Sequence, residues 1–360
     1  MTDRRKNPNE EKKNSFGSVI TSAFDLPGRI TAEYFDSLDP FSREAIWQLC
    51  YRDLNSYDFR IDSPRELSQV CFNSETCFPD AVRDMADRVM QDGKKHILGD
   101  TSLTGKGIKV AVIDRPINKD HIEFRDRIEY VNVAPDHPDN EYADFHGMVC
   151  ASFLSGSSCG VAPGSELVYF AIPNETNDLK RYYSHQLSAL EKIVRYNETS
   201  PSPIRVVSLS APFLPEQKEA RDALADKLEK TRCALIDATV FGRSFQGIDF
   251  ERFSPDPSFV LNGWQTENYE NNKDRPGFTD DFSSLCFVPS TRRTSAANDT
   301  NDSYIHWSKT VSESWTIPHV AGVYALCLQK CPDLRFEVFI AKCKKCERKN
   351  GYIVLNTDLL

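Results

Sequence analysis

Residues 104–114, TGKGIKVAVID, form a glycine-containing turn followed by a short run of β-branched and apolar residues that ends in an aspartate. Such a run, bounded by turn residues, is typical of a buried strand. Four similar runs follow along the chain, and amphipathic stretches lie between them. The strand candidates are residues 109–113, 166–172, 205–210, 233–238 and 284–289. This alternation predicts an α/β fold with a mostly parallel sheet and helices on both faces.

Residues 1–98 show a different pattern from the rest of the chain. The first 16 residues, MTDRRKNPNEEKKNSF, are nearly all polar and predict a disordered tail. The pattern that follows is helical, and the pair Asp39-Pro40 is typical of a helix start because a capping acid precedes a proline of the first turn. We therefore expect a tail over residues 1–16, a small helical region over 17–98 and an α/β domain over 99–360.

The charge balance limits the kinds of partner. The 360-residue chain has a formal net charge of −9, whereas nucleic acids and anionic membranes require a basic surface, so we expect neither as a partner. The polar N-terminal stretch resembles no signal peptide, and no later run is long enough to span a bilayer. Eleven cysteines, an odd number at irregular spacing, fit reduced thiols. We therefore expect a cytoplasmic protein.

Four cysteines lie close together in the sequence CLQKC…CKKC. Cys327, Cys331, Cys343 and Cys346 would form a zinc site only if their thiolates converged in a tetrahedron. Cys327, however, lies in an apolar helical run, where a small buried thiol is the simpler interpretation. Calcium would require an acidic loop of ligand spacing, and the sequence shows no clear one. We therefore expect no metal and no cofactor.

Three residues with reactive side chains lie where such a fold forms sites. Asp114 ends the first predicted strand, His146 precedes Gly147 at the start of a small, apolar helical stretch, and Ser314 begins the run leading into WTIPHVAGVYALCLQ. Individually these could be a turn residue, a structural histidine and a helix cap. In an open parallel sheet, however, the carboxyl ends of the strands and the helix starts facing them form the sites. Each of the three residues therefore lies where a site could form, but taken singly each is better explained by its structural role.

The words around these residues resemble a known family. Four motifs occur in the same order as in the subtilisin-like serine peptidases, and the residues Asp, His and Ser also follow one another in that family's order. The motifs are TGKGIKVAVID, HGMVCASFLSG, GVAPGSELVYFA and SWTIPHVAG. The resemblance runs from about residue 100 to the C-terminus. The tryptophan after the serine and the stretch VPSTRRTSA look like a divergent intracellular bacterial branch of that family.

The resemblance implies a subtilisin-like fold and an intracellular serine endopeptidase, or processing protease, acting on peptide or protein substrates. Ser314 would be the nucleophile, His146 the base that takes its proton, and Asp114 the group that orients the imidazole. At a helix start, the backbone N–H of Ser314 would point at the developing oxyanion. Pro318 would be tolerated because N–H groups of the first helical turn have no partner inside the helix.

The resemblance also implies a site for the substrate. The family binds an extended peptide against strand edges. The motif that is usually Ser-Leu-Gly in the family is Ser210-Ala211-Pro212 in this chain. Trp315 occupies a position at which the family usually has methionine. We expect Ser210, Ala211 and Trp315 to line this site. The proline removes one N–H from the edge, so at least one main-chain bond to the substrate must differ.

One departure from the family concerns the oxyanion hole. The family has an asparagine after the strand that corresponds to residues 233–238, and this chain has none there. Thr239, Arg243 and Asn262 are alternatives that spacing does not distinguish. The departure leaves two other functions open. One is a catalytically inactive subtilase fold that binds peptides or regulates a partner, and the other is acyl transfer to a different acceptor, such as peptide ligation.

Overall fold

The computed structural model describes nine segments of the chain. They are residues 69–72, 102–137, 143–175, 178–248, 285–289, 293–307, 312–346, 348–349 and 352–355. The predicted tail and nearly all of the predicted helical region lie outside these segments. Within that region the described residues Gln69–Phe72 form a strand, β1, where we expected helix. Its partner is a distant strand of the α/β part of the chain, a contact that local sequence periodicity cannot reveal.

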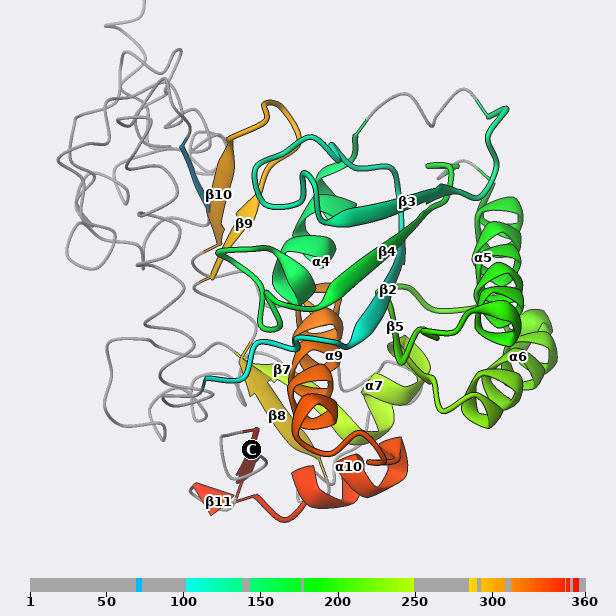
Figure 1. Ribbon diagram of the computed structural model, residues 1–360, viewed down its shortest axis with the longest axis vertical. Helices are drawn as coiled ribbons and strands as arrows, with labels where there is room; N and C mark the ends of the chain where they lie inside the picture. Colours follow the sequence, from blue (N-terminus) through cyan, green and yellow to red (C-terminus); the bar gives the residue numbers. More distant parts are fainter. Residues whose placement is uncertain are drawn as a thin grey trace, which may run out of the picture.

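The central sheet has five parallel strands in the order β3-β4-β2-β5-β6 (Figure 1). The strands are β2 (Lys109–Asp114), β3 (Ile128–Asn132), β4 (Glu166–Ala171), β5 (Val206–Leu209) and β6 (Ala234–Asp237). Four of them correspond to predicted runs. The edge strand β3 was not predicted, because most of its residues are only half-buried and it lacks the apolar run of the others.

Helices cover both faces of this sheet. The helices α4 (Phe145–Ser155) and α9 (Glu313–Lys330) share one core with Val110 and Val112 of β2. The helices α5 (Leu179–Thr199) and α6 (Lys218–Lys230) share the other with Ala111 and Ile113. Because successive strand residues face opposite sides, the part of a strand that is covered on both sides must be apolar, as residues 110–113 (VAVI) are. The mostly parallel α/β fold with helices on both faces is therefore confirmed.

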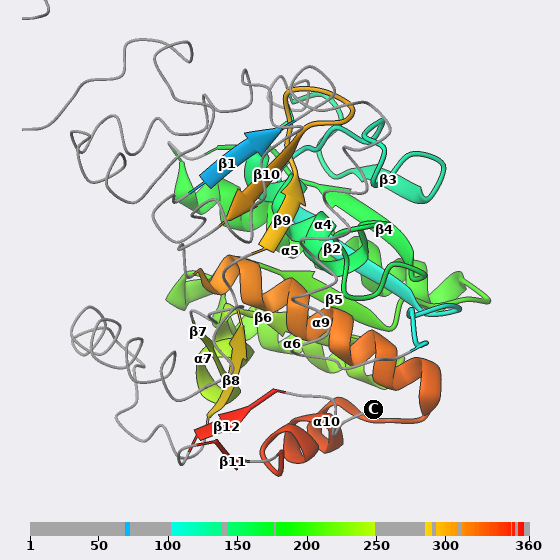
Figure 2. The same cartoon turned by 90° about the vertical axis from the view of Figure 1, so that its left-hand side faces the viewer.

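Two smaller sheets lie on either side of α9 (Figure 2). One is antiparallel and has the order β1-β10-β9, with β9 at Arg293–Ala296 and β10 at Tyr304–Trp307. The other has the order β11-β12-β8-β7. Its strands are β7 (Phe245–Ile248), β8 (Cys286–Pro289), β11 (Arg348–Lys349) and β12 (Tyr352–Val354). The run predicted at 284–289 is β8, and within the described residues it pairs with β7 and β12 rather than with the central sheet.

Three short helices complete the described part of the chain: η5 (Pro215–Gln217), α7 (Ala238–Ser244) and α10 (Phe336–Cys343). Among the helices described, none combines the length and apolar character needed to cross a lipid bilayer. For the site, the important contact is between α4 and α9, which lie against each other on one face of the sheet. A small residue permits the close packing of α9, because a Cβ on Gly322 would lie only 2.6 Å from the Cβ of Val161.

Candidate active site

Asp114 is the last residue of β2 and lies at the carboxyl end of the central sheet. Its side chain is buried, and the N–H of Arg115 donates to its Oδ1 at 2.8 Å. Both carboxylate oxygens lie 2.9 Å from Nδ1 of His146. Burial alone would raise the pKa of Asp114, but the imidazole and the Arg115 N–H hold that pKa below its ordinary value. The carboxylate therefore stays ionised and fixes the ring.

His146 is the second residue of α4, so the helix start sets the position of its ring. The N-cap residue Asp144 accepts the N–H of His146 at 2.8 Å, and Asp144 is itself held by Asn174 at 3.2 Å. Burial would lower the pKa of His146, but the facing carboxylate of Asp114 and the thiol of Cys150 raise that pKa above its ordinary 6.5. The imidazole thus holds a proton more tightly than an isolated histidine.

Ser314 is the second residue of α9 and so lies at a helix start, where the sequence pattern placed it. Its backbone N–H donates to the hydroxyl of the N-cap residue Ser312 at 3.2 Å. Its own hydroxyl donates to the carbonyl oxygen of Ser210 at 3.5 Å, a long hydrogen bond. The backbone N–H of Ser314, which we expected to stabilise an oxyanion, is therefore already hydrogen-bonded to the N-cap hydroxyl.

The expected reason for tolerating Pro318 is wrong. The helix begins at Glu313, so Pro318 lies beyond the first turn, where its missing N–H would have bonded the carbonyl of Ser314. That carbonyl oxygen instead accepts the Ser210 hydroxyl at 3.1 Å and the thiol of Cys150 at 3.4 Å. Pro318 therefore leaves the carbonyl oxygen of Ser314 available for hydrogen bonds that hold the start of α9 against the end of β5 and against α4.

The structure brings the three predicted residues together, but it links only two of them directly. Within the described part of the chain, His146 is hydrogen-bonded to Asp114, whereas no hydrogen bond joins His146 to Ser314. Cys150 lies between the Asp114–His146 pair and Ser314. Its Sγ is 3.9 Å from Nδ1 of His146 and 3.4 Å from the carbonyl oxygen of Ser314. Catalytic hydrogen bonds in substrate-free sites are often long and tighten only when substrate binds.

The residues expected to line the substrate site differ in their surroundings. Ser210 follows β5 and contacts Ser314, whereas Ala211 packs against the core on the α5 side of the sheet. Trp315 is only 4% exposed, and its ring centroid lies 5.6 Å from that of His146 and 5.1 Å from that of Trp307. The indole is thus buried against the imidazole of His146 instead of forming an open wall.

The oxyanion asparagine has no identified replacement. Thr239 lies in α7, directly after β6, and its side chain is half-buried. The side chain of Arg243 and the whole of Asn262 lie outside the described residues. The choice among the three therefore remains open.

Sequence reasoning missed Cys150. It lies four residues after His146 on α4, a spacing that places two side chains on the same helix face, so the sequence did contain the signal. Burial raises the pKa of this thiol, so it stays protonated and can donate to the Ser314 carbonyl. The signal was easily overlooked because a buried cysteine on a helix is common.

Among the described residues, one group has donor atoms close enough to hold a metal ion. It consists of Asp114, His146 and Cys150, whose donor atoms lie within 4.8 Å of one another. Asp114 and His146 form a hydrogen-bonded pair and Cys150 is a protonated thiol, so no ion is needed to explain why these residues lie together. The cysteines of CLQKC…CKKC form no such group in the described part of the chain; Cys327, Cys343 and Cys346 are buried thiols and Cys331 is exposed.

Comparison with known proteins agrees with the geometry. Residues 105–234 match the subtilase family, and this segment includes Asp114 and His146 but ends before Ser314. No curated protein matches the sequence.

Two similar solved structures are both subtilisin-related. A cold adapted subtilisin-like serine proteinase is 18% identical, with 72% of this chain and 91% of that chain covered and a TM-score of 0.49. Fervidolysin from Fervidobacterium pennivorans, a keratinolytic enzyme related to subtilisin, is 14% identical, with 78% of this chain covered and a TM-score of 0.52. This chain spans 47% of the fervidolysin chain. The chain therefore has a subtilisin-like α/β fold, and its residues 105–234 are similar to the subtilase family.

Proposed function

We propose that this protein is an intracellular serine endopeptidase that cleaves peptide or protein substrates through an acyl-enzyme on Ser314. The observation that carries the proposal is the pairing of Asp114 with His146 at 2.9 Å, beside the helix start that bears Ser314. A buried carboxylate that holds one imidazole nitrogen leaves the other free to take a proton from a nearby hydroxyl.

In the proposed reaction, Nε2 of His146 removes the proton of the Ser314 hydroxyl as that oxygen attacks the carbonyl carbon of the scissile bond. Asp114 keeps the Nδ1–H in place and stabilises the imidazolium. The imidazolium then gives its proton to the departing amine, and the C–N bond breaks to leave an ester on Ser314. A water molecule, deprotonated by the same imidazole, hydrolyses the ester and restores the hydroxyl.

The oxyanion would be stabilised at the start of α9. The positive end of the helix dipole and the Ser314 N–H lie there, although the Ser312 hydroxyl holds that N–H at 3.2 Å. A long capping bond to a neutral hydroxyl is weaker than a charge-assisted one to an oxyanion, so the developing charge would displace it. Without the family's asparagine, turnover should be lower by about 10²–10³ unless another side chain replaces it.

A cytoplasmic setting is part of the proposal. In the described segments, eight cysteines are thiols that form no disulfide. Structural disulfides are rare in cytoplasmic proteins because the compartment keeps thiols reduced. The net charge of −9 agrees with a protein substrate more readily than with a nucleic acid.

A fluorophosphonate probe tests whether the nucleophile is activated, since the probe reacts only with a serine whose proton is being removed. We expect the native protein to be labelled and Ser314→Ala to be silent. Ser188→Ala, at a half-buried serine in the middle of α5, is the matched control and should be labelled like the native protein. A peptide-library digest at neutral pH, with Ser314→Ala as the blank, would then reveal the cleavage preference.

One observation favours the inactive, peptide-binding alternative. The Ser314 hydroxyl donates to the carbonyl of Ser210 and makes no hydrogen bond to His146 within the described residues. If that arrangement persisted with substrate bound, the hydroxyl would keep its proton. Equal silence of the native protein and Ser314→Ala toward the probe, combined with measurable peptide binding by both, would replace the peptidase with this alternative. Adding a competing amine to the digest separates hydrolysis from ligation.

A further inference from the structure

The end of β2 and the start of α4 are in direct backbone contact. The N–H of Asp144 donates to the carbonyl oxygen of Pro116 at 2.7 Å. The helix packs so closely on the strand end that a Cβ on Gly147 would lie only 2.5 Å from the carbonyl oxygen of Arg115. The two segments that carry the paired carboxylate and imidazole of the candidate site therefore meet at one junction.

The side chain of Arg115 crosses this junction. Its Nη1 lies 3.4 Å from both carboxylate oxygens of Asp144, and the two side chains are only 22% and 15% exposed. The guanidinium carbon also lies 5.9 Å from the ring centre of Tyr182 on α5, within the range of a cation–π contact. Burial works to lower the pKa of Arg115, but the facing carboxylate of Asp144 and the other neighbours raise that pKa. The guanidinium therefore stays charged, in a place where solvent screens the pair less than at the surface.

The carboxylate of Asp144 receives hydrogen bonds from two further directions. Its Oδ1 accepts the backbone N–H of His146 at 2.8 Å, and its Oδ2 accepts the side-chain amide of Asn174 at 3.2 Å. Because the first of these bonds caps α4 at His146 itself, the position of the carboxylate sets where the imidazole begins. The ion pair thus joins the residue that follows Asp114 to the group that places His146.

We propose that Arg115 and Asp144 are positioning residues that hold the imidazole of His146 against the carboxylate of Asp114. Neither side chain takes part in the bond changes of the proposed reaction; both act through the contacts at the junction. Only the catalytic consequence rests on the peptidase function proposed above. The alternative is an ion pair that contributes to stability and leaves the imidazole unaffected.

The first test measures the hydrogen bond between His146 and Asp114 without any turnover. The proton on Nδ1 of His146 gives a low-field NMR resonance, and its exchange with water reports how often this bond opens. The full chain carrying Ser314→Ala is the background, with Asp144→Asn or Arg115→Met added. Asparagine caps a helix as well as aspartate, and methionine keeps an unbranched apolar stem. We expect exchange about tenfold faster in each variant, the change that loss of one hydrogen bond to a charged group produces.

The second test measures cleavage of a fluorogenic peptide by the same variants with Ser314 intact. We expect kcat to fall about tenfold and KM to change by less than about twofold, because the pair positions the base and does not contact the substrate. The double variant should also lose about tenfold and not a hundredfold, since both single changes remove the same interaction. Arg115→Lys restores a cation beside Asp144 and should lie closer to the native protein than Arg115→Met.

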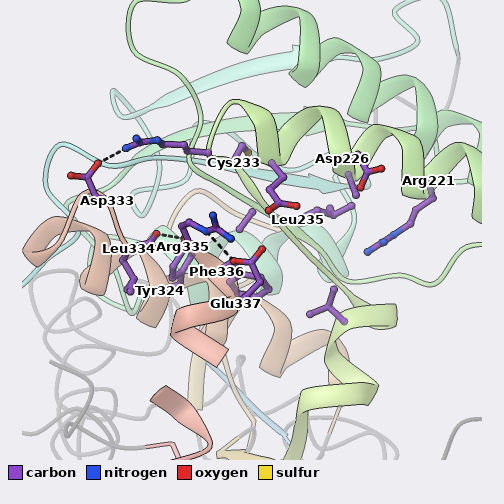
Figure 3. A pocket seen from close by; sticks show the side chains of 15 residues that line it. Arg221, Asp226, Cys233, Leu235, Tyr324, Asp333, Leu334, Arg335, Phe336 and Glu337 are labelled. Atoms are coloured by element: carbon purple, nitrogen blue, oxygen red, sulfur yellow. Dashed lines mark hydrogen bonds and ion pairs between the residues drawn. The ribbon is translucent and has the colours of Figure 1, made fainter. Parts of the chain in front are cut away.

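The control applies the same two substitutions to a remote ion pair. Arg232 and Asp333 are paired and exposed at the rim of a cavity of about 370 Å³, which lies between α6 and the start of α10 (Figure 3). None of the residues of the candidate active site lines this cavity. Arg232→Met and Asp333→Asn should therefore match the native protein in both exchange and kcat.

Native exchange and native kcat in both single variants would overturn the proposal, even if urea denaturation showed them to be less stable. A hundredfold loss in the double variant would show that the two residues act independently and not as a pair. If Arg115→Met does not fold, Asp144→Asn decides, because it retains the cap. If the fluorophosphonate probe does not label the native protein, the peptidase proposal fails, and the exchange measurement still tests the pair.

Discussion

At the scale of single residues, the carbonyl oxygen of Ser314 is the point where three elements of the candidate site meet. Pro318 leaves this oxygen without a helical partner, and Ser210 of the β5 end and Cys150 of α4 donate to it instead. A helix start that bears the proposed nucleophile must be fixed in position, because a misplacement of about 1 Å costs orders of magnitude in rate. The proline and the two donors together fix the first turn of α9 against the sheet.

Replacement of Asp114 by asparagine should lower kcat/KM by about 10⁴, because an amide favours the wrong tautomer of the imidazole. The same variant should change the pH profile. The base is active only when the imidazole is neutral, so kcat/KM rises with pH through the pKa of His146, and the raised pKa places the midpoint above the ordinary 6.5. Without the carboxylate that raises this pKa, the midpoint should move down. Rates of cleavage of a fluorogenic peptide between pH 5 and about 10 measure both effects.

The control for this experiment is Asp178→Asn, at the exposed N-cap of α5, where asparagine caps equally well. It should leave the profile unchanged. An Asp114→Asn variant whose midpoint stays where the native one lies would show that the carboxylate does not govern the imidazole. That result would also remove the main support for the proposed mechanism.

At the scale of elements, the packing of α9 depends on Gly322. Glycine inside an exposed helix is normally destabilising relative to alanine, so Gly→Ala should add about 0.5–1 kcal/mol of stability. Here a Cβ would approach that of Val161 to 2.6 Å, closer than real Cβ atoms lie. We therefore expect Gly322→Ala to lower the free energy of unfolding by about 1–3 kcal/mol, the usual cost of overpacking, as measured by urea denaturation.

A second substitution isolates the cause. Val161→Gly removes both the Cβ and the methyl group that a new Cβ on residue 322 would meet, so the double variant should be more stable than the sum of the two single changes predicts. Strict additivity would mean that Val161 is not the obstacle. A Gly322→Ala protein at least as stable as the native one would show that the helix shifts freely and that the contact does not constrain α9.

The elements of the central sheet could be predicted because each buried strand carries its own signal. After their charged first residues, KVAVI and ELVYFA are apolar and buried, as parallel strands covered on both faces must be. The strand β3 and the pairing of β1 with β10 had no such signal, since the first is only half-buried and the second depends on a contact between distant parts of the chain. The periodicity of apolar residues indicates which side chains are buried, but it does not indicate which strand or helix they pack against.

The site was predictable to the same extent. The positions of Asp114 and His146 follow from a strand end and a helix start, and the structure joins them by a hydrogen bond. The contacts of Ser314 were not predictable, because they depend on a carbonyl that Pro318 leaves free and on a thiol from another helix. The catalytic roles of the three residues stay a proposal until the probe and the pH profile are measured.

At the scale of the whole molecule, the strand β1 is connected by contacts to the candidate site. β1, at Gln69–Phe72, pairs with β10, and β10 ends at Trp307, whose ring lies 5.1 Å from that of Trp315. Trp315 in turn packs against His146, with a ring separation of 5.6 Å. A continuous series of contacts thus connects the N-terminal strand with the imidazole.

Deletion of residues 1–98 should therefore change both the stability and the activity of the protein. The deletion removes β1 and leaves one side of β10 unpaired, and an unpaired edge strand promotes aggregation. We expect a lower thermal midpoint, by about 2–4 °C for each kcal/mol lost, with increased light scattering and slower cleavage of the fluorogenic peptide. Deletion of residues 1–16 retains β1 and its pairing with β10, so we expect it to change none of these. A protein lacking residues 1–98 that matches the native one in midpoint, scattering and rate would show that β1 supports neither β10 nor the aromatic contacts behind His146.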